Sequence, residues 1–148
     1  MADRVGVMKQ GKLEQIAFPD QLYAHPVTAF VAEFVGTMNR IPCEVAGTGQ
    51  VRALGAVVPV HGQQPAGDVK EVDVLVRPEG LRIEAAPGGN GTVTDRSFLG
   101  SVSRISVRLS GDVTVKVDHP SVDAGGFGPG ASVQISLPGA AVLIAERA

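Results

Sequence analysis

Apolar and polar residues alternate over most of the chain, and the alternation is clearest at residues 101–110. Successive side chains of a strand point to opposite faces, and here the odd-numbered face, which carries Ile105 and Val107, is the more apolar. We expect that face to be buried. The turn at 110–112 leads into a second alternating run. Similar runs predict strands at 4–9, 12–17, 41–46, 50–54, 56–60, 71–77, 81–84, 91–98, 101–110, 112–117, 131–137 and 141–146.

Helical spacing occurs only near the start of the chain. Pro19 suits the first turn of a short helix at 20–24. A second helix is predicted after Pro26 and ends at Gly36. Its apolar residues recur at i, i+3, i+4, i+7 and i+8, which gives one amphipathic face that must pack on a partner surface; they are Val27, Phe30, Val31, Phe34 and Val35.

Glycine and proline separate these elements. The chain has 19 Gly and 10 Pro among 148 residues, and this content favours short strands and many turns. The loosest segments are 61–68, 85–90 and the glycine-rich 123–130. We interpret 85–90 as the divider between two halves of a β structure. The predicted fold is mainly β, a barrel or sandwich, preceded by a β-hairpin and two short helices.

The first 36 residues contain a spaced series of motifs: Ala2-Asp3-Arg4-Val5, Val7-Met8, Gly11, Glu14-Gln15, Pro19, Tyr23, Pro26, Phe30-Val31-Ala32 and Phe34-Val35-Gly36. This series resembles the segment that closes the nucleotide-binding domain in ATP-binding subunits of ABC importers. Phe18 stands where the family has Thr or Ser, so the next helix lacks a capping hydroxyl, at a cost of about 1 kcal/mol. Because a lone hairpin is marginal in water, we expect this segment to continue a larger protein.

The later part of the chain has a second set of motifs: Val76-Arg77-Pro78-Glu79, Leu81, Ile83, Gly91-Thr92-Val93, Phe98-Leu99-Gly100 and the run 130–138. These motifs resemble the transport-associated OB-like (TOBE) domain of the same importers. The resemblance implies an OB-like barrel, built as two intertwined sub-barrels. It also implies that residues 1–39 are a C-terminal remnant of the nucleotide-binding domain and residues 40–148 the regulatory domain, nearest to the polyamine, iron and sugar importers.

Catalytic motifs are absent from the sequence. No G-x-x-x-x-G-K-[ST] loop is present to hold phosphates, and the glycine-rich run 125–130 contains no lysine. We therefore expect no cofactor, catalytic residue or ATP hydrolysis in this chain, with ATP and Mg²⁺ belonging to the parent protein. His25, His61 and His119 are far apart, and we place all three in loops or junctions. Cys43 is the one cysteine, which predicts no metal site or disulfide and favours a reducing compartment.

Charge and apolar content exclude two further classes. The net charge is −2, there is no basic cluster, and Phe98 and Phe127 are the only aromatic residues after Gly36; nucleic-acid binding demands more positive charge. No apolar run is long enough to span a bilayer. The family resemblance implies a cytoplasmic protein that is held at the inner face of the cell membrane by its permease subunits.

Seven residues are candidates for a ligand or interface role. Arg77 and Glu79 flank Pro78 and either fix the entry to the second half of the barrel or contact a ligand. Arg104 and Arg108 share one strand face with Ser106, which lies about 7 Å along the strand from each of them. This face either holds an oxyanion or is solvated. The remaining candidates are Phe98, Leu99 and Gly100.

Three functions follow from these patterns. The first is a regulatory part of an importer subunit that forms a homodimer, with the exposed apolar face of Phe30, Val31 and Phe34 as one reason to expect self-association. The second is a sensor of an oxyanion, polyamine or sugar that modulates transport. The third, a freestanding enzyme, has the least support because the motifs are missing.

Overall fold

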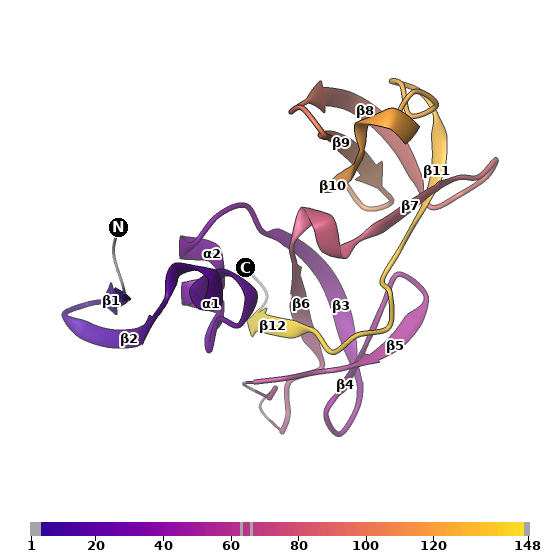
Figure 1. Cartoon of the computed structure of the whole chain (residues 1–148). Coiled ribbons are helices and arrows are strands. Elements are labelled where there is room, and N and C mark those ends of the chain that lie inside the picture. Colours follow the sequence, from indigo (N-terminus) through magenta and orange to yellow (C-terminus); the bar gives the residue numbers. More distant parts are fainter. Residues whose placement is uncertain (1–3, 63, 66, 147–148) are drawn as a thin grey trace.

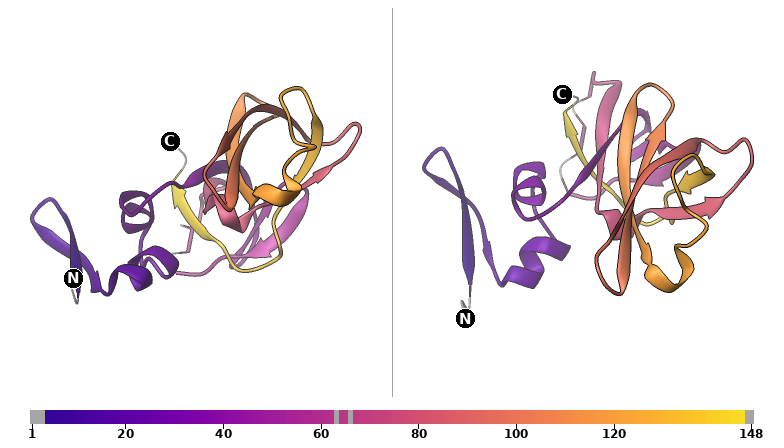
Figure 2. Two further views of the ribbon diagram at one scale, coloured as in Figure 1. Left: turned by 45° about the horizontal axis from the view of Figure 1, so that its top comes forward. Right: turned by 90° about the horizontal axis from the view of Figure 1, so that it is seen from above.

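The computed structural model describes residues 4–62, 64–65 and 67–146. It begins with an antiparallel hairpin of β1 (Val5–Lys9) and β2 (Lys12–Ala17). Gln10 and Gly11 make the two-residue turn, with φ angles of 51° and 78°, the conformation that suits the twist of a hairpin. The hairpin lies at one end of the molecule and the later strands lie at the other (Figures 1 and 2).

Two six-residue helices follow, α1 (Pro19–Ala24) and α2 (Ala29–Phe34). Phe18 gives α1 no side-chain cap, as predicted, but the Gln21 side chain accepts a hydrogen bond from the Phe18 N–H at 3.3 Å. The Thr28 hydroxyl caps α2 by accepting from the Val31 N–H at 3.3 Å. Each of these short helices therefore has one backbone N–H at its N-terminal end that is bound by a side chain.

The prediction that the apolar face of the second helix is exposed is partly wrong. Val31 is completely buried with Val7 and Leu22, in a small core between the hairpin and the helices. Phe30 is half-buried and stacks on Phe34, which is 64% exposed. The hairpin supplies the partner surface, because β1 brings Val7 against α1 and α2.

The remaining strands form two five-stranded sheets (Figure 1). The first has the order β12-β6-β3-β4-β5 and the second the order β10-β9-β8-β11-β7, and every pair of neighbouring strands is antiparallel. The strands of the first sheet are β3 (Asn39–Gly47), β4 (Gln50–Ala53), β5 (Ala56–Pro59), β6 (Glu71–Val76) and β12 (Leu143–Glu146). Those of the second are β7 (Arg82–Ala85), β8 (Gly91–Phe98), β9 (Val102–Leu109), β10 (Val113–Pro120) and β11 (Ser132–Ser136).

The chain passes between the sheets twice. It leaves the first sheet through the 3₁₀ turn η1 (Pro78–Gly80) and returns through residues 137–142 to add β12. β12 thus belongs to the first sheet although every strand of the second sheet precedes it in the chain. The segment 85–90 does not divide the halves as predicted, because it connects β7 and β8 within the second sheet.

Both sheets contribute to one shared core. The predicted inner face of β9 is buried, with Ser103, Ile105, Val107 and Leu109 all enclosed. These apolar residues pack with Val74 of the first sheet in a single cluster. Alternation therefore located the core face correctly.

Two asparagine side chains each bind both the N–H and the carbonyl of one backbone residue, as a residue of a neighbouring strand would. The Asn39 side chain donates to the Lys116 carbonyl and accepts from the Lys116 N–H, both at 2.8 Å. Asn90 does the same with Ile135, at 2.8 and 2.7 Å. Asn39 lies in the first sheet and Lys116 in the second, so this pair fastens the two sheets together.

Candidate functional site

Arg40, Arg77 and Arg104 connect the segment that carries α1 and α2 to the two sheets. We call this connection the joint, and it is the candidate site. Arg77 lies between β6 and η1, where the chain leaves the first sheet. Its guanidinium Cζ is 4.1 Å from the centroid of the Tyr23 ring of α1, a cation–π contact. The same group donates to the carbonyls of Tyr23 and Thr37, both at 3.2 Å.

Gly36 provides the space for this contact. Its φ is +107°, and a Cβ there would lie 3.3 Å from the Tyr23 ring and 3.6 Å from Arg77 Nη1. A side chain would therefore be strained and crowded at the end of α2. The glycine that ends the helix in the sequence pattern also makes room for the joint.

Glu79 holds the other end of the same tyrosine. The Tyr23 hydroxyl donates to Glu79 Oε2 at 2.6 Å. Burial raises the pKa of Tyr23, and the hydrogen bond to Glu79 and the charge of Glu79 raise it further. Burial also lowers the pKa of Arg77, and this effect is opposed by the neighbouring Tyr23 and by the charge of Glu79.

Arg104 extends the joint to the second sheet. Its guanidinium is held by both carboxylate oxygens of Asp118, at 2.8 and 3.1 Å, in the bidentate geometry that favours arginine. A further N–H donates to the Thr37 hydroxyl at 3.5 Å. The hydrogen bond with Asp118 raises the pKa of Arg104 against the opposing effect of burial. Thr37 is therefore held from both sheets.

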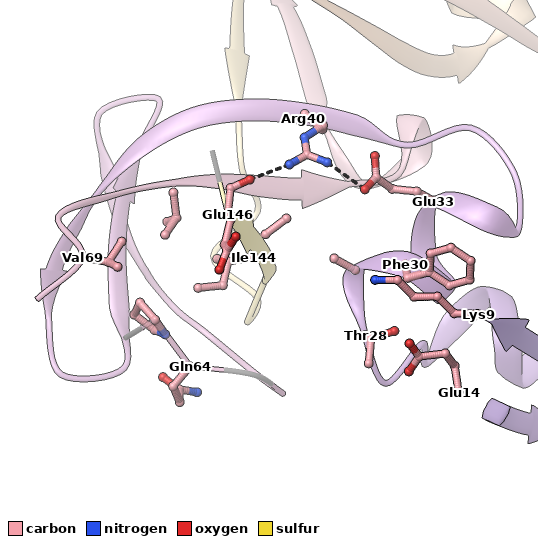
Figure 3. A pocket seen from close by; sticks show the side chains of 14 residues that line it. Lys9, Glu14, Thr28, Phe30, Glu33, Arg40, Gln64, Val69, Ile144 and Glu146 are labelled. Carbon is pink, nitrogen blue, oxygen red and sulfur yellow. Dashed lines mark hydrogen bonds and ion pairs between the residues drawn. The ribbon is translucent and has the colours of Figure 1, made fainter. Parts of the chain in front are cut away.

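Arg40 makes the third connection, at the start of β3 (Figure 3). Its guanidinium binds Glu33 of α2 at 2.7 Å, buried Asp73 of β6 at 3.1 Å and the Glu146 carbonyl of β12 at 2.7 Å. Burial opposes the charge on Arg40, but the hydrogen bonds to Asp73 and Glu33 outweigh it and raise the pKa.

A cavity of about 720 Å³ lies beside Arg40, between the helical segment and the first sheet. Lys9 lies over the Phe30 ring on one wall, with its ammonium 5.2 Å from the ring centroid. Ile144 and Val69 form the opposite wall (Figure 3).

The candidate residues from the sequence fall into two groups. Arg77, Glu79 and Arg104 meet at the joint around Tyr23 and Thr37. Phe98, Leu99 and Gly100 lie at the exposed turn between β8 and β9, where Gly100 has a φ of +100°. Arg108 is exposed near the far end of β9 and has no ion pair among the residues that the structure describes.

Sequence reasoning missed Tyr23, Thr37, Arg40 and Asp118 of the joint, together with Glu33 and Asp73, which bind Arg40. Asp118 had a usable signal, because the predicted turn at 110–112 sets a register in which Arg104 faces Asp118, as the structure shows. Tyr23 was noted as part of the family resemblance, but nothing in the pattern tied it to Arg77. Arg40 and Thr37 carry no local signal, since their partners are distant in sequence.

Metal-binding and catalytic groups were sought among the described residues outside this joint. Among the described ranges, no group of three or more His, Cys, Asp and Glu side chains is placed to hold a metal ion. His119 lies in β10 rather than in a loop, with its ring edge-to-face against Phe127 at 5.2 Å. No helix in the described part of the chain is long and apolar enough to cross a bilayer.

Comparison with known proteins identifies relatives for most of the chain. An Fe(3+) ions import ATP-binding protein of Rhodococcus jostii is 37% identical over 147 residues, which cover 95% of this chain and 41% of the relative. A spermidine/putrescine import ATP-binding protein of Ruegeria pomeroyi is 32% identical, covering 94% of this chain and 40% of the relative. A sulfate/thiosulfate import ATP-binding protein of Chromobacterium violaceum is 35% identical, with 75% and 31% covered. The chain spans less than half the length of each.

A solved structure shares the fold. The molybdate-bound form of the cytoplasmic molybdate-binding protein ModG superposes with a TM-score of 0.57 at 15% identity, covering 74% of this chain and 96% of that one. The mainly β, OB-like architecture predicted from the sequence is thus confirmed. Residues 74–144 match the TOBE domain family. The chain is therefore homologous to the ATP-binding subunits of ABC importers and contains a TOBE domain.

Proposed function

We propose that this chain is the regulatory and accessory part of an ABC importer ATP-binding subunit. Residues 1–39 are the C-terminal remnant of the nucleotide-binding domain, and residues 40–148 are the regulatory domain. The observation that carries the proposal is the triple joint, in which Arg40, Arg77 and Arg104 hold the segment from Tyr23 to Thr37 against both sheets.

The physical argument concerns stiffness. A guanidinium that binds two or three groups at once resists rotation of one element against another, since every bond must stretch together. A movement of α1 or α2 therefore passes to the sheets instead of being absorbed in the linker. Such a joint suits a domain that reports on, or restrains, the ATP-binding core.

Further features belong to the whole protein. ATP and Mg²⁺ bind in the parent's catalytic core, and this chain hydrolyses no ATP by itself. Its partners are that core, the permease subunits at the inner face of the cell membrane and a second copy of the chain. Nucleic acid is not a partner, because the net charge is −2.

A chimera tests the regulatory role. The corresponding part of the Rhodococcus jostii relative, 37% identical over 147 residues, is replaced by this chain, and ATP turnover is measured with its permease. Arg77→Ala in the chimera is expected to change turnover at least about threefold while ATP affinity stays constant, because the joint is loosened and the nucleotide site is not. Arg108→Ala, at an exposed position outside the joint, is the matched control.

Two outcomes contradict this proposal. One is a chimera in which Arg77→Ala, Arg40→Ala and Arg108→Ala all leave turnover unchanged. The other is Mg²⁺-dependent ATP turnover by the isolated chain that follows the protein through purification.

A second candidate is a ligand-sensing domain. The fold neighbour ModG was crystallised with molybdate bound, and relatives carry names for sulfate, polyamine and ferric iron import. Arg108 has a free guanidinium in the described chain, but Arg104 is already held by Asp118. A thermal-shift screen of oxyanions, polyamines and sugars tests this role, and no shift at millimolar ligand would eliminate it.

A further inference from the structure

The outer half of β8 is an open sheet edge. At its start β8 pairs with β9 on one side and with β11 on the other, through Gly91 and Thr92. The register with β9 then shifts between Val93 and Asp95. Beyond this bulge, β8 has β9 as its single strand partner among the described residues.

The backbone groups on this edge point away from β9. The Leu99 N–H donates to the Val102 carbonyl at 2.9 Å, and hydrogen-bonded pairs alternate with non-hydrogen-bonded pairs in antiparallel strands. Arg96 and Phe98 therefore direct their N–H and C=O outward. The backbone groups of Val93 also point outward. Its N–H donates to the Ala131 carbonyl at 2.9 Å, and its carbonyl accepts from the Gly130 N–H at 2.8 Å. No such partner serves Arg96 or Phe98 in the part of the chain that the structure describes.

Apolar side chains border the open edge. Phe98 is 77% exposed, Leu99 56% and Val122 91%. The Ser121 hydroxyl donates to the Gly100 carbonyl at 2.6 Å, so the 3₁₀ turn that carries Val122 lies against the β8–β9 turn. An exposed, apolar strand edge of this kind is a template for another strand.

We propose that Asp95–Leu99 pairs antiparallel with the same segment of a second copy, so that β10-β9-β8 continues across a twofold axis into the partner's sheet. The inference rests on the proposed self-association for its partner and adds the surface and register. In this register Arg96 faces the partner's Phe98 and Ser97 faces the partner's Ser97. Asp95 faces the partner's Leu99.

Self-complementarity selects this partner and this register. Two outward-facing pairs, each exchanging two hydrogen bonds, satisfy Arg96 and Phe98 of both copies. Each arginine then lies beside a phenylalanine, and the small Ser97 lies on the axis. A register with Arg96 opposite Arg96 opposes like charges. One with Phe98 opposite Phe98 pairs only that residue, because Gly100 already belongs to the turn.

A cysteine cross-link in the full chain tests the register. Ser97 pairs across the axis at a non-hydrogen-bonded position, where Cα atoms lie about 4.5 Å apart, within the disulfide range of about 4.4–6.8 Å. Ser97→Cys is expected to give at least about half covalent dimer under mild oxidation. Asp95→Cys is the matched control on the same strand face, about 13 Å from its own copy along the strand. Native Cys43 is buried and does not compete.

A second variant measures the association without a disulfide. Phe98→Pro removes an N–H that β9 does not use, so the fold should persist, because proline is tolerated at a free edge. We expect sedimentation equilibrium to show at least tenfold weaker self-association than the wild type, with an unchanged melting temperature. Phe98→Thr keeps the N–H and is expected to weaken association less.

The outcomes separate this inference from the proposed function. A wild-type dimer with no Ser97→Cys cross-link, or with equal cross-linking of Asp95→Cys, overturns the β8 surface and leaves self-association standing. A chain that stays monomeric at high concentration and does not cross-link overturns both, and leaves the edge to an extended segment of another protein. Selective cross-linking of Ser97→Cys supports the surface whatever the chimera shows.

Discussion

The Arg77 guanidinium lies over the Tyr23 ring, with Cζ 4.1 Å from the ring centroid, and donates to the Tyr23 carbonyl at 3.2 Å. The hydroxyl of the same tyrosine donates to Glu79, two residues beyond Arg77. One side chain of α1 thus contacts the residue before the turn η1 and the middle residue of that turn, which carries the chain from the first sheet to the second. The same side chain therefore holds α1 against the crossover between the two sheets.

Replacing Tyr23 by Phe tests the hydroxyl alone. Tyr23→Phe keeps the ring under Arg77 and removes the 2.6 Å hydrogen bond to Glu79. We expect a loss of about 0.5–1.5 kcal/mol in the free energy of unfolding, since the acceptor is exposed. Urea denaturation measures the loss, and a double-mutant cycle with Glu79→Gln isolates the pair. A coupling energy near zero would contradict the role given to this contact.

The same pair predicts a dependence on alkaline pH. Burial and Glu79 raise the pKa of Tyr23 above its ordinary value of 10.0, so the folded state favours the neutral phenol more than the unfolded state does. This contribution to stability is complete below about pH 10 and is lost as pH rises through the folded-state pKa. Above about pH 10, the free energy of unfolding should fall more steeply for the wild type than for Tyr23→Phe. Parallel curves would refute this.

Arg40 is predicted to be the most sensitive arginine of the joint. Arg40→Ala removes partners from Glu33, from buried Asp73 and from the Glu146 carbonyl together. We expect a destabilisation of about 2–3 kcal/mol, dominated by Asp73, because a buried carboxylate that loses a cation is costly. Arg40→Lys keeps the charge but cannot reach all three groups and should recover less than half. Chemical denaturation checks both, and a loss no greater than that of Arg77→Ala or Arg104→Ala would contradict the prediction.

Asn39 is predicted to hold the two sheets together. Asn39→Ala leaves the N–H and carbonyl of Lys116 without the side chain that binds both at 2.8 Å. The expected loss is about 1–3 kcal/mol, from unpaired and partly buried backbone groups. Asn39→Asp should lose as much, because a carboxylate accepts from the N–H but repels the carbonyl. Asn90→Ala, which removes the equivalent pair with Ile135, provides the comparison. Unchanged unfolding curves for Asn39→Ala and Asn39→Asp would rule this role out.

Local pattern predicted much of the secondary structure. Alternation at residues 101–110 identified the buried face of β9, because a two-residue period is a property of the strand itself. The turn at 110–112 also contained the register that pairs Arg104 with Asp118. The helical segment was located through Pro19 and Gly36, but the burial of Val31 was missed, because it depends on Val7 of a hairpin that lies elsewhere in the chain.

The sequence alone determined the class of the fold, the positions of most strands and the relationship to importer subunits, since these depend on local periodicity and motif order. Tertiary structure alone decided which residues form the joint. Arg40 meets Glu33, Asp73 and Glu146, and Tyr23 meets Arg77 and Glu79, across separations of up to 106 residues. Such contacts arise when β12 returns to the first sheet and Tyr23 of α1 meets the turn η1. No local pattern encodes them, because they depend on how finished elements pack.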